Sequence, residues 1–112
     1  MASSPHVTVR TDKFTVEFLL DGSEDLDTIE EVDATVIAPN GGRRSASLMT
    51  LRYVQELMER RRVTGEGDSG HHFRCHDLVL VREGGLDSMV RALVGLFDDY
   101  RLEGNILPRL DD

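Results

Sequence analysis

The chain has 112 residues, of which 39% are hydrophobic and 30% charged, and its formal net charge is −8 at pH 7. This length and composition are typical of one folded domain with its own core, assigned to residues 1–112, and they exclude a disordered chain. The negative charge repels phosphate backbones, so no nucleic-acid binding is expected. No apolar run approaches the ~20 residues of a membrane helix. With no visible signal peptide and one cysteine, Cys75, a cytoplasmic location and no membrane partner are expected.

Alternating apolar and polar residues predict three strands in the first half of the chain. Residues 6–20 are expected to form a strand with a turn or a bulge at residues 11–13, where the parity of the apolar positions changes. Residues 32–38 and 43–49 alternate in the same way. Pro-Asn-Gly-Gly at residues 39–42 separates them and favours a tight turn, so these two strands are expected to form a hairpin.

The second half of the chain predicts two helices and one more strand. Thr50 can cap an amphipathic helix over residues 51–62. Residues 71–81 alternate as a strand, residues 86–100 carry a broad apolar stripe at helical spacing, and residues 105–107 suit a short edge segment. The order is therefore β-β-β-α-β-α. We predict an α+β two-layer sandwich, in which three or four mainly antiparallel strands carry two helices on one face.

An acidic segment at residues 21–33 holds seven acidic residues and no basic one. Its chemistry fits a loop that keeps the protein soluble, and it also fits a docking surface for a basic protein. The spacing of an EF-hand loop is absent, so no calcium site is expected. The candidate partner-binding residues are Asp21, Glu24, Asp25, Asp27, Glu30 and Glu31.

A second candidate region, residues 66–77, combines a glycine-rich loop with three histidines and Cys75. On a strand, His72 and His76 would lie about 13 Å apart and Cys75 would face the opposite way, so neither a metal site nor a catalytic pair is expected. A small polar ligand could still bind at this loop. The candidate ligand-pocket residues are Glu66, Asp68, His72, Arg74 and His76.

Short motifs between residues 47 and 81 give a resemblance to other proteins. They are Ser-Leu-Met-Thr at 47–50, Thr-Gly-Glu at 64–66, Gly-His-His-Phe at 70–73 and Asp-Leu-Val-Leu-Val at 77–81. In these motifs the chain resembles a group of small uncharacterised bacterial single-domain proteins of about this length. That group tends to have an aromatic pair where this chain has His72 and Phe73. The resemblance implies a small bacterial domain, but it implies no activity and assigns no functional residue.

Two functions are compatible with these observations. The first is an acidic binding or regulatory module that acts through a protein partner, for example as an immunity-type inhibitor of a basic toxin. The alternative is a small enzyme that depends on a ligand or a metal and uses residues 66–77. The sequence supplies no coherent catalytic set and implies no cofactor, which favours the binding module. A sheet edge or a helix face could also build a homodimer.

Overall fold

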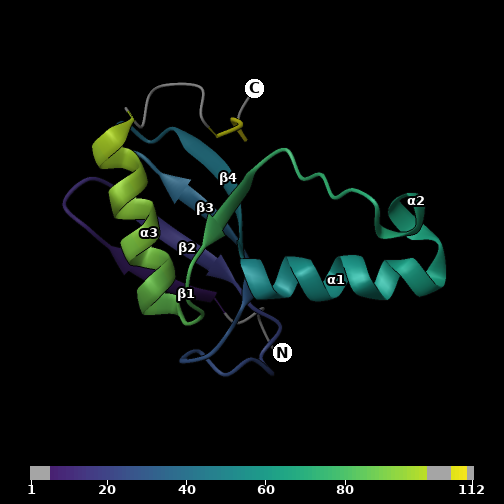
Figure 1. Ribbon diagram of the computed structural model, residues 1–112. Coiled ribbons are helices and arrows are strands. Elements are labelled where there is room, and N and C mark those ends of the chain that lie inside the picture. The colour runs from purple at the N-terminus through teal and green to yellow at the C-terminus, as the bar shows by residue number, and fades with distance from the viewer. Residues whose placement is uncertain (1–5, 101–106, 111–112) are drawn as a thin grey trace.

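The computed structural model describes residues 6–100 and 107–110, so expectations for residues 1–5 and 105–106 lie outside the described ranges. In chain order the elements are β1 (His6–Arg10), β2 (Thr15–Leu19), β3 (Glu31–Ile37), β4 (Arg43–Thr50), α1 (Leu51–Thr64), α2 (Glu66–Gly70), β5 (Leu78–Val81) and α3 (Leu86–Asp99). The strands form one sheet in the order β1-β2-β3-β4-β5 (Figure 1). The predicted α+β class is confirmed. The expected three or four strands are wrong, because the sheet has five strands and is mixed, with β4 and β5 parallel.

The additional strand comes from residues 6–20. Of the two alternatives predicted at residues 11–13, a turn forms rather than a bulge, and it divides this segment into the hairpin β1–β2. The backbone N–H of Thr11 donates to the Phe14 carbonyl at 2.8 Å, and the Thr11 hydroxyl donates to the same oxygen at 2.9 Å. These bonds close a turn, after which β2 pairs antiparallel with β1, with Val7 opposite Phe18. The change of parity at residues 11–13 therefore marks a reversal of the chain.

The second hairpin, β3–β4, agrees with the sequence. The Ala38 N–H donates to the Gly42 carbonyl at 2.8 Å, and the Gly41 N–H donates to the Ala38 carbonyl at 2.9 Å. Gly41 adopts a φ of 92°, which glycine tolerates. The register places Ala34 opposite Ala46 and Val32 opposite Leu48. These small and branched side chains lie on the face of the sheet that helix α3 covers.

The hydrophobic core lies between this face and α3 (Figure 1). Helix α3 buries four residues spaced three or four apart, which is one side of a helix. Phe97 of α3 meets Phe14 edge to face, with ring centroids 5.5 Å apart. The buried helix residues are Leu86, Met89, Leu93 and Phe97. We call the opposite side of the sheet the open face; it includes Glu17, Leu19, Asp33, Ile37, Leu78 and Leu80.

The strand predicted over residues 71–81 is wrong for its first seven residues. Only Leu78–Val81 forms β5, beside the second half of β4. The first half of β4 is taken by the C-terminal tail, because Ser45 donates its backbone N–H to Pro108 and Leu110 donates to Arg43, both at 3.0 Å. A longer β5 would have no partner there. The tail adds an edge segment at residues 108–110, C-terminal to the predicted one at 105–107, most of which lies outside the described residues.

The expectation that both helices cover one face is also wrong, because α1 leaves the sheet. It continues directly from β4 and points away from the rest of the molecule (Figure 1). Its predicted cap is confirmed: Tyr53 donates its backbone N–H to the Thr50 hydroxyl at 3.0 Å. Helix α2 and residues 71–76 then return along α1. We call residues 51–76 the arm, and the other described residues the body; no residue of the arm is buried.

Candidate functional site

The acidic loop between β2 and β3 is held to the body by its backbone. The carbonyl of Ile29 accepts from Gly85 N–H at 2.7 Å, and the carbonyl of Leu26 accepts from Leu86 N–H at 2.9 Å. The Ile29 side chain is buried in the core. The loop is thus pinned against the start of α3, and its acidic side chains project from a fixed backbone.

Glycines make this close approach feasible. A Cβ atom at Gly84 would lie 2.8 Å from the carbonyl oxygens of Thr28 and Ile29, and one at Gly85 would lie 2.6 Å from that of Asp27. Real Cβ atoms essentially never approach backbone oxygens so closely, and Gly85 also has a φ of 96°. The Gly84-Gly85 pair therefore lets the acidic loop lie directly against the start of α3.

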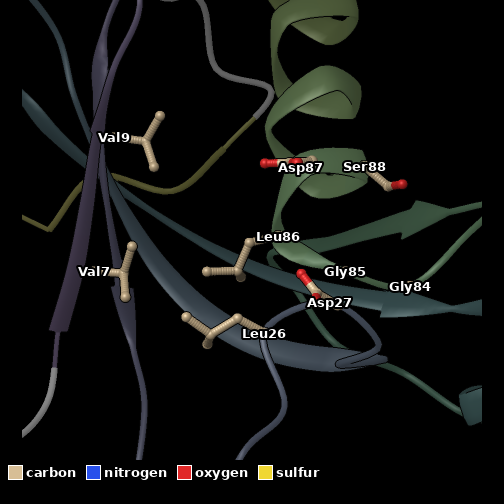
Figure 2. Close-up of a pocket in the computed structure, with 9 residues that line it drawn as sticks. All are labelled: Val7, Val9, Leu26, Asp27, Gly84, Gly85, Leu86, Asp87 and Ser88. Atoms are coloured by element: carbon tan, nitrogen blue, oxygen red, sulfur yellow. The ribbon is translucent and has the colours of Figure 1, made fainter.

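A cavity of about 330 Å³ lies where this loop, β1 and the start of α3 meet. Figure 2 shows the side chains of Leu26 and Leu86 extending toward Val7 and Val9 of β1. Asp27 lies at its rim beside the glycines. The aliphatic side chains give the cavity an apolar wall, while Asp27, Asp87 and Ser88 add polar groups to its lining.

Several carboxylates of the loop have a structural role. Glu24 accepts from the backbone N–H groups of Asp21 and Gly22, each at 3.0 Å. Asp21 accepts from the Ser23 hydroxyl at 2.6 Å and from its N–H at 2.8 Å, and these bonds lower the pKa of Asp21. Asp25 likewise accepts from the backbone N–H of residue 27 at 3.0 Å. These three carboxylates stabilise the shape of the loop, because they accept hydrogen bonds from backbone N–H groups that no strand or helix satisfies.

Glu30 ties the loop to the root of the arm. It accepts from the Thr50 hydroxyl at 2.7 Å, and its carboxylate lies 3.4 Å from Nε of Arg52. Its backbone carbonyl accepts from the Thr50 N–H at 2.9 Å. Among the described residues, the pair between Glu30 and Arg52 is the single ion pair that involves the acidic segment.

Four carboxylates meet around a second cavity, of about 430 Å³, which we call the acidic groove. It lies at the beginning of β3, where Glu31 and Asp33 share the open face and Asp21 and Glu24 approach from the loop. Burial, and then the charges of Asp33 and Glu24, raise the pKa of Glu31. A carboxyl group that is forced to share its site with like charges favours a bound cation.

Two groove residues, Asp33 and His6, were not among the predicted site residues. The signal for Asp33 is its spacing: residues two apart on a strand share a face, so Asp33 follows Glu31. No pattern in the sequence places His6 there, because β1 reaches the groove only through its pairing with Leu19 of β2. Of the predicted acidic residues, Asp21, Glu24 and Glu31 line the groove, while Asp25, Asp27 and Glu30 do not.

The residues predicted as a ligand pocket lie on the arm, and all five are exposed. Because residues 71–77 are not a strand, the alternation argument for His72 and His76 does not apply. Within the described part of the chain, no group of three or more His, Cys, Asp or Glu side chains is placed to hold a metal ion. The arm instead brings Arg61 over the Phe73 ring, at 5.6 Å from its centroid. The predicted set is Glu66, Asp68, His72, Arg74 and His76.

A polar cluster joins the end of the arm to the open face. Asp77 is buried, and it accepts from the Ser45 hydroxyl at 2.8 Å and from the Cys75 thiol at 3.1 Å. Burial alone raises the pKa of Asp77, but the hydrogen bonds from Cys75 and Ser45 outweigh it and the net shift is downward. Burial and the bond to Asp77 raise the pKa of Cys75. A raised pKa favours the protonated thiol, and the hydrogen bonds of the cluster fasten the segment before β5 to β4.

Comparison of the chain with protein-family models, with curated proteins and with solved structures gave no match. None of the helices in the described ranges has the length and apolar character needed to cross a lipid bilayer.

Proposed function

We propose that this protein is a binding module that docks onto a basic protein through the acidic groove and the loop beside it. The observation that carries the proposal is the groove itself, in which Glu31 lies among like charges. Among the described residues, none of its four carboxylates forms an ion pair with an arginine or lysine of the chain. An arginine or lysine of a partner would relieve this repulsion.

The anchoring of the loop supports the same function. Backbone hydrogen bonds and the glycine pair at residues 84–85 fix the loop before any partner binds. A preformed charged surface loses little conformational entropy on association and steers an oppositely charged partner. Inhibition of a basic toxin by an immunity-type protein is one form that this function takes.

The test neutralises exposed Asp27 of the loop and partly buried Glu31 of the groove, whose carboxylates accept no hydrogen bond from other described residues. The double variant Asp27→Asn/Glu31→Gln removes two charges but keeps side-chain size and leaves Glu24 and Glu30 in place. The matched control, Asp12→Asn/Asp99→Asn, makes the same change in net charge in the β1–β2 turn and at the end of α3. Any general effect of net charge appears equally in both variants.

Binding is measured first with an oligo-arginine peptide, by NMR titration at low and high salt. We expect shifts in the loop and in β3 that weaken with salt and are reduced in the Asp27/Glu31 variant but not in the control. Capture from lysate of the source cell, with all three proteins as bait, then identifies the natural partner. A partner retained equally by both variants contradicts docking through the groove.

The alternative, an enzyme that uses residues 66–77, remains a prediction. Native mass spectrometry of untagged protein tests it, because a bound metal or ligand adds mass that disappears on denaturation. Added mass that is lost in the His72→Ala/His76→Ala variant would favour the enzyme over the binding module.

A further inference from the structure

Helix α1 does not pack along the sheet, and the open face of the sheet is not covered by a helix of the described residues. Parallel strands such as β4 and β5 are joined by a crossover, whose helix ordinarily packs on the sheet. Here α1 is the crossover helix, yet it meets the sheet only near its root and points outward (Figure 1). Among the described residues, no helix covers the open face.

Helix α1 carries an apolar stripe that its own chain covers only in part. Tyr53, Val54, Leu57 and Met58 follow the spacing of one helix face, and each remains partly exposed even though α2 and residues 71–76 return along the arm. An amphipathic helix is stabilised chiefly by packing of its apolar face against other elements. The arm alone does not supply enough of this packing for α1.

The open face presents apolar side chains that match this stripe. Leu19 is 43% exposed and Leu80 is 49% exposed. Leu78 is partly exposed next to Leu80 on β5, and Ile37 is partly exposed at the other end of β3, opposite Thr15. Dimensions agree as well. Fourteen residues of α1 extend about 21 Å, and five strands span about 19 Å from β1 to β5.

The distribution of charge indicates what could cover the open face. The arm holds five arginines and four acidic residues, for a net charge of +1. The rest of the chain then has 8 basic and 17 acidic residues, a net charge of −9. Acidic Glu17, Glu31 and Asp33 lie on the open face. Arg60 and Arg62 are exposed at the end of α1, where Arg62 also pairs with Glu59 at 3.1 Å. The arm is therefore complementary to the open face of another copy of the same chain.

We infer that the protein forms a two-fold dimer in which each copy lays α1 across the open face of the other. The exchange is reciprocal, so the contact closes on itself and does not propagate into a fibre. It supplies in the dimer the helix-on-sheet packing that the β4–α1–β5 crossover lacks within one chain. The open face shares Leu19, Glu31 and Asp33 with the acidic groove, so a dimer of this kind would compete with a docked partner. Leu57 and Leu80, the positions changed in the tests below, lie outside the groove, so the two proposals can fail separately.

The first test is the mass in solution, measured by sedimentation over the micromolar range with untagged protein. We expect twice the 12.6 kDa of the chain, with dissociation favoured by high salt. Leu57→Glu places a charge in the stripe and should raise the dimer dissociation constant at least about tenfold. Val63→Glu is the matched control, because Val63 is 86% exposed on another side of α1.

Two further experiments separate this dimer from other arrangements. Leu80→Glu alters the open face at a half-exposed position, so the fold is retained and the dimer should weaken as it does with Leu57→Glu. A photo-crosslinking residue at position 57, in a mixture of isotope-labelled and unlabelled protein, should join α1 of one copy to β2, β3 or β5 of the other. A monomer at all concentrations overturns the inference, and so do crosslinks that join α1 only to its own chain or to the partner's α1.

Discussion

The body and the arm are built from similar residues but are held together differently. The body buries a continuous core between five strands and α3, in which Val16, Phe18 and Leu93 have no exposed surface. The arm has an amphipathic helix of the same length as α3, and yet no residue between positions 51 and 76 is buried. Its shape depends on local features: a helix cap, a cation–π contact and glycines in tight turns.

This difference shows that amphipathicity alone does not place a helix. Helix α3 begins beside the sheet at Gly84-Gly85 and is brought back over it, whereas α1 extends directly from the end of β4. Free energy of folding should therefore reside mainly in the body, while the arm opens locally at lower cost. The arm is free to move or to dock without loss of the core.

The largest effect on the free energy of unfolding is expected when a leucine of the body is shortened to alanine, compared with the same change in the arm. Leu93→Ala removes a fully buried side chain and should lower the free energy of unfolding by about 2–5 kcal/mol. Leu57→Ala alters a partly exposed residue of α1 and should cost about 1 kcal/mol or less at low protein concentration. Urea denaturation measures both. Equal losses would show that the arm belongs to the same cooperative core.

The next effect concerns the contact between the acidic loop and α3. Gly85→Ala adds a Cβ atom 2.6 Å from the Asp27 carbonyl oxygen at a φ of 96°, and we expect a loss of about 1–3 kcal/mol. Gly95→Ala is the control: Gly95 is exposed inside α3 with nothing near its added Cβ, so the change should stabilise the protein by about 0.5–1 kcal/mol. If Gly85→Ala is tolerated as well as Gly95→Ala, the loop is not pinned as described.

A smaller effect is expected when the arm itself is strained. Gly70→Ala would place a Cβ atom 2.1 Å from the Met58 carbonyl oxygen, so α2 must separate from α1. The global loss cannot exceed the free energy of opening the arm, and faster hydrogen exchange should be confined to residues 51–76. Gly65→Ala has a similar positive φ but open space around it, and it isolates the backbone cost from the clash. Faster exchange throughout α3 would contradict an independent arm.

The body could be predicted well because its signals are local and periodic. The alternation in β2, β3 and β4 indicates their buried faces, and the Asn-Gly-Gly turn indicates the pairing of β3 with β4. The acidic character of the loop could also be predicted from the sequence. The groove could not, because it depends on the lateral pairing of β1 with β2, which brings His6 beside Leu19 and Asp33.

The sequence-based predictions are wrong where the structure of a segment depends on which other segments lie next to it. Residues 71–77 alternate as a strand would, but the edge of β4 that they need is occupied by residues 108–110. Residues 51–62 follow a helical period, which is confirmed, but no local signal states whether the helix turns back onto the sheet. The glycines at 84 and 85 indicate a break in the chain, and only the tertiary structure shows that Thr28 and Ile29 pass within contact distance.

The smallest predicted effect is electrostatic and links the body to its proposed function. The pKa of Glu31 is raised from its ordinary 4.5, so the folded protein binds this proton more tightly than the unfolded chain does. Stability contributed by Glu31 is therefore present at acid pH and lost as the pH rises through the folded pKa. Glu31→Gln should raise the melting temperature slightly at pH 7 and leave it nearly unchanged below pH 4.5. The control Glu83→Gln, at an exposed site, should leave the melting temperature nearly unchanged at both pH values.

The same titration reports on binding. A basic group seated in the groove favours the charged form of Glu31, so binding near the raised pKa should release a proton. Calorimetry with the oligo-arginine peptide in buffers of different ionisation enthalpy measures that release directly. We expect proton release from the unaltered protein and none from Glu31→Gln, even where the variant still binds. Release that persists in Glu31→Gln would assign the proton to another group and remove Glu31 from the docking site.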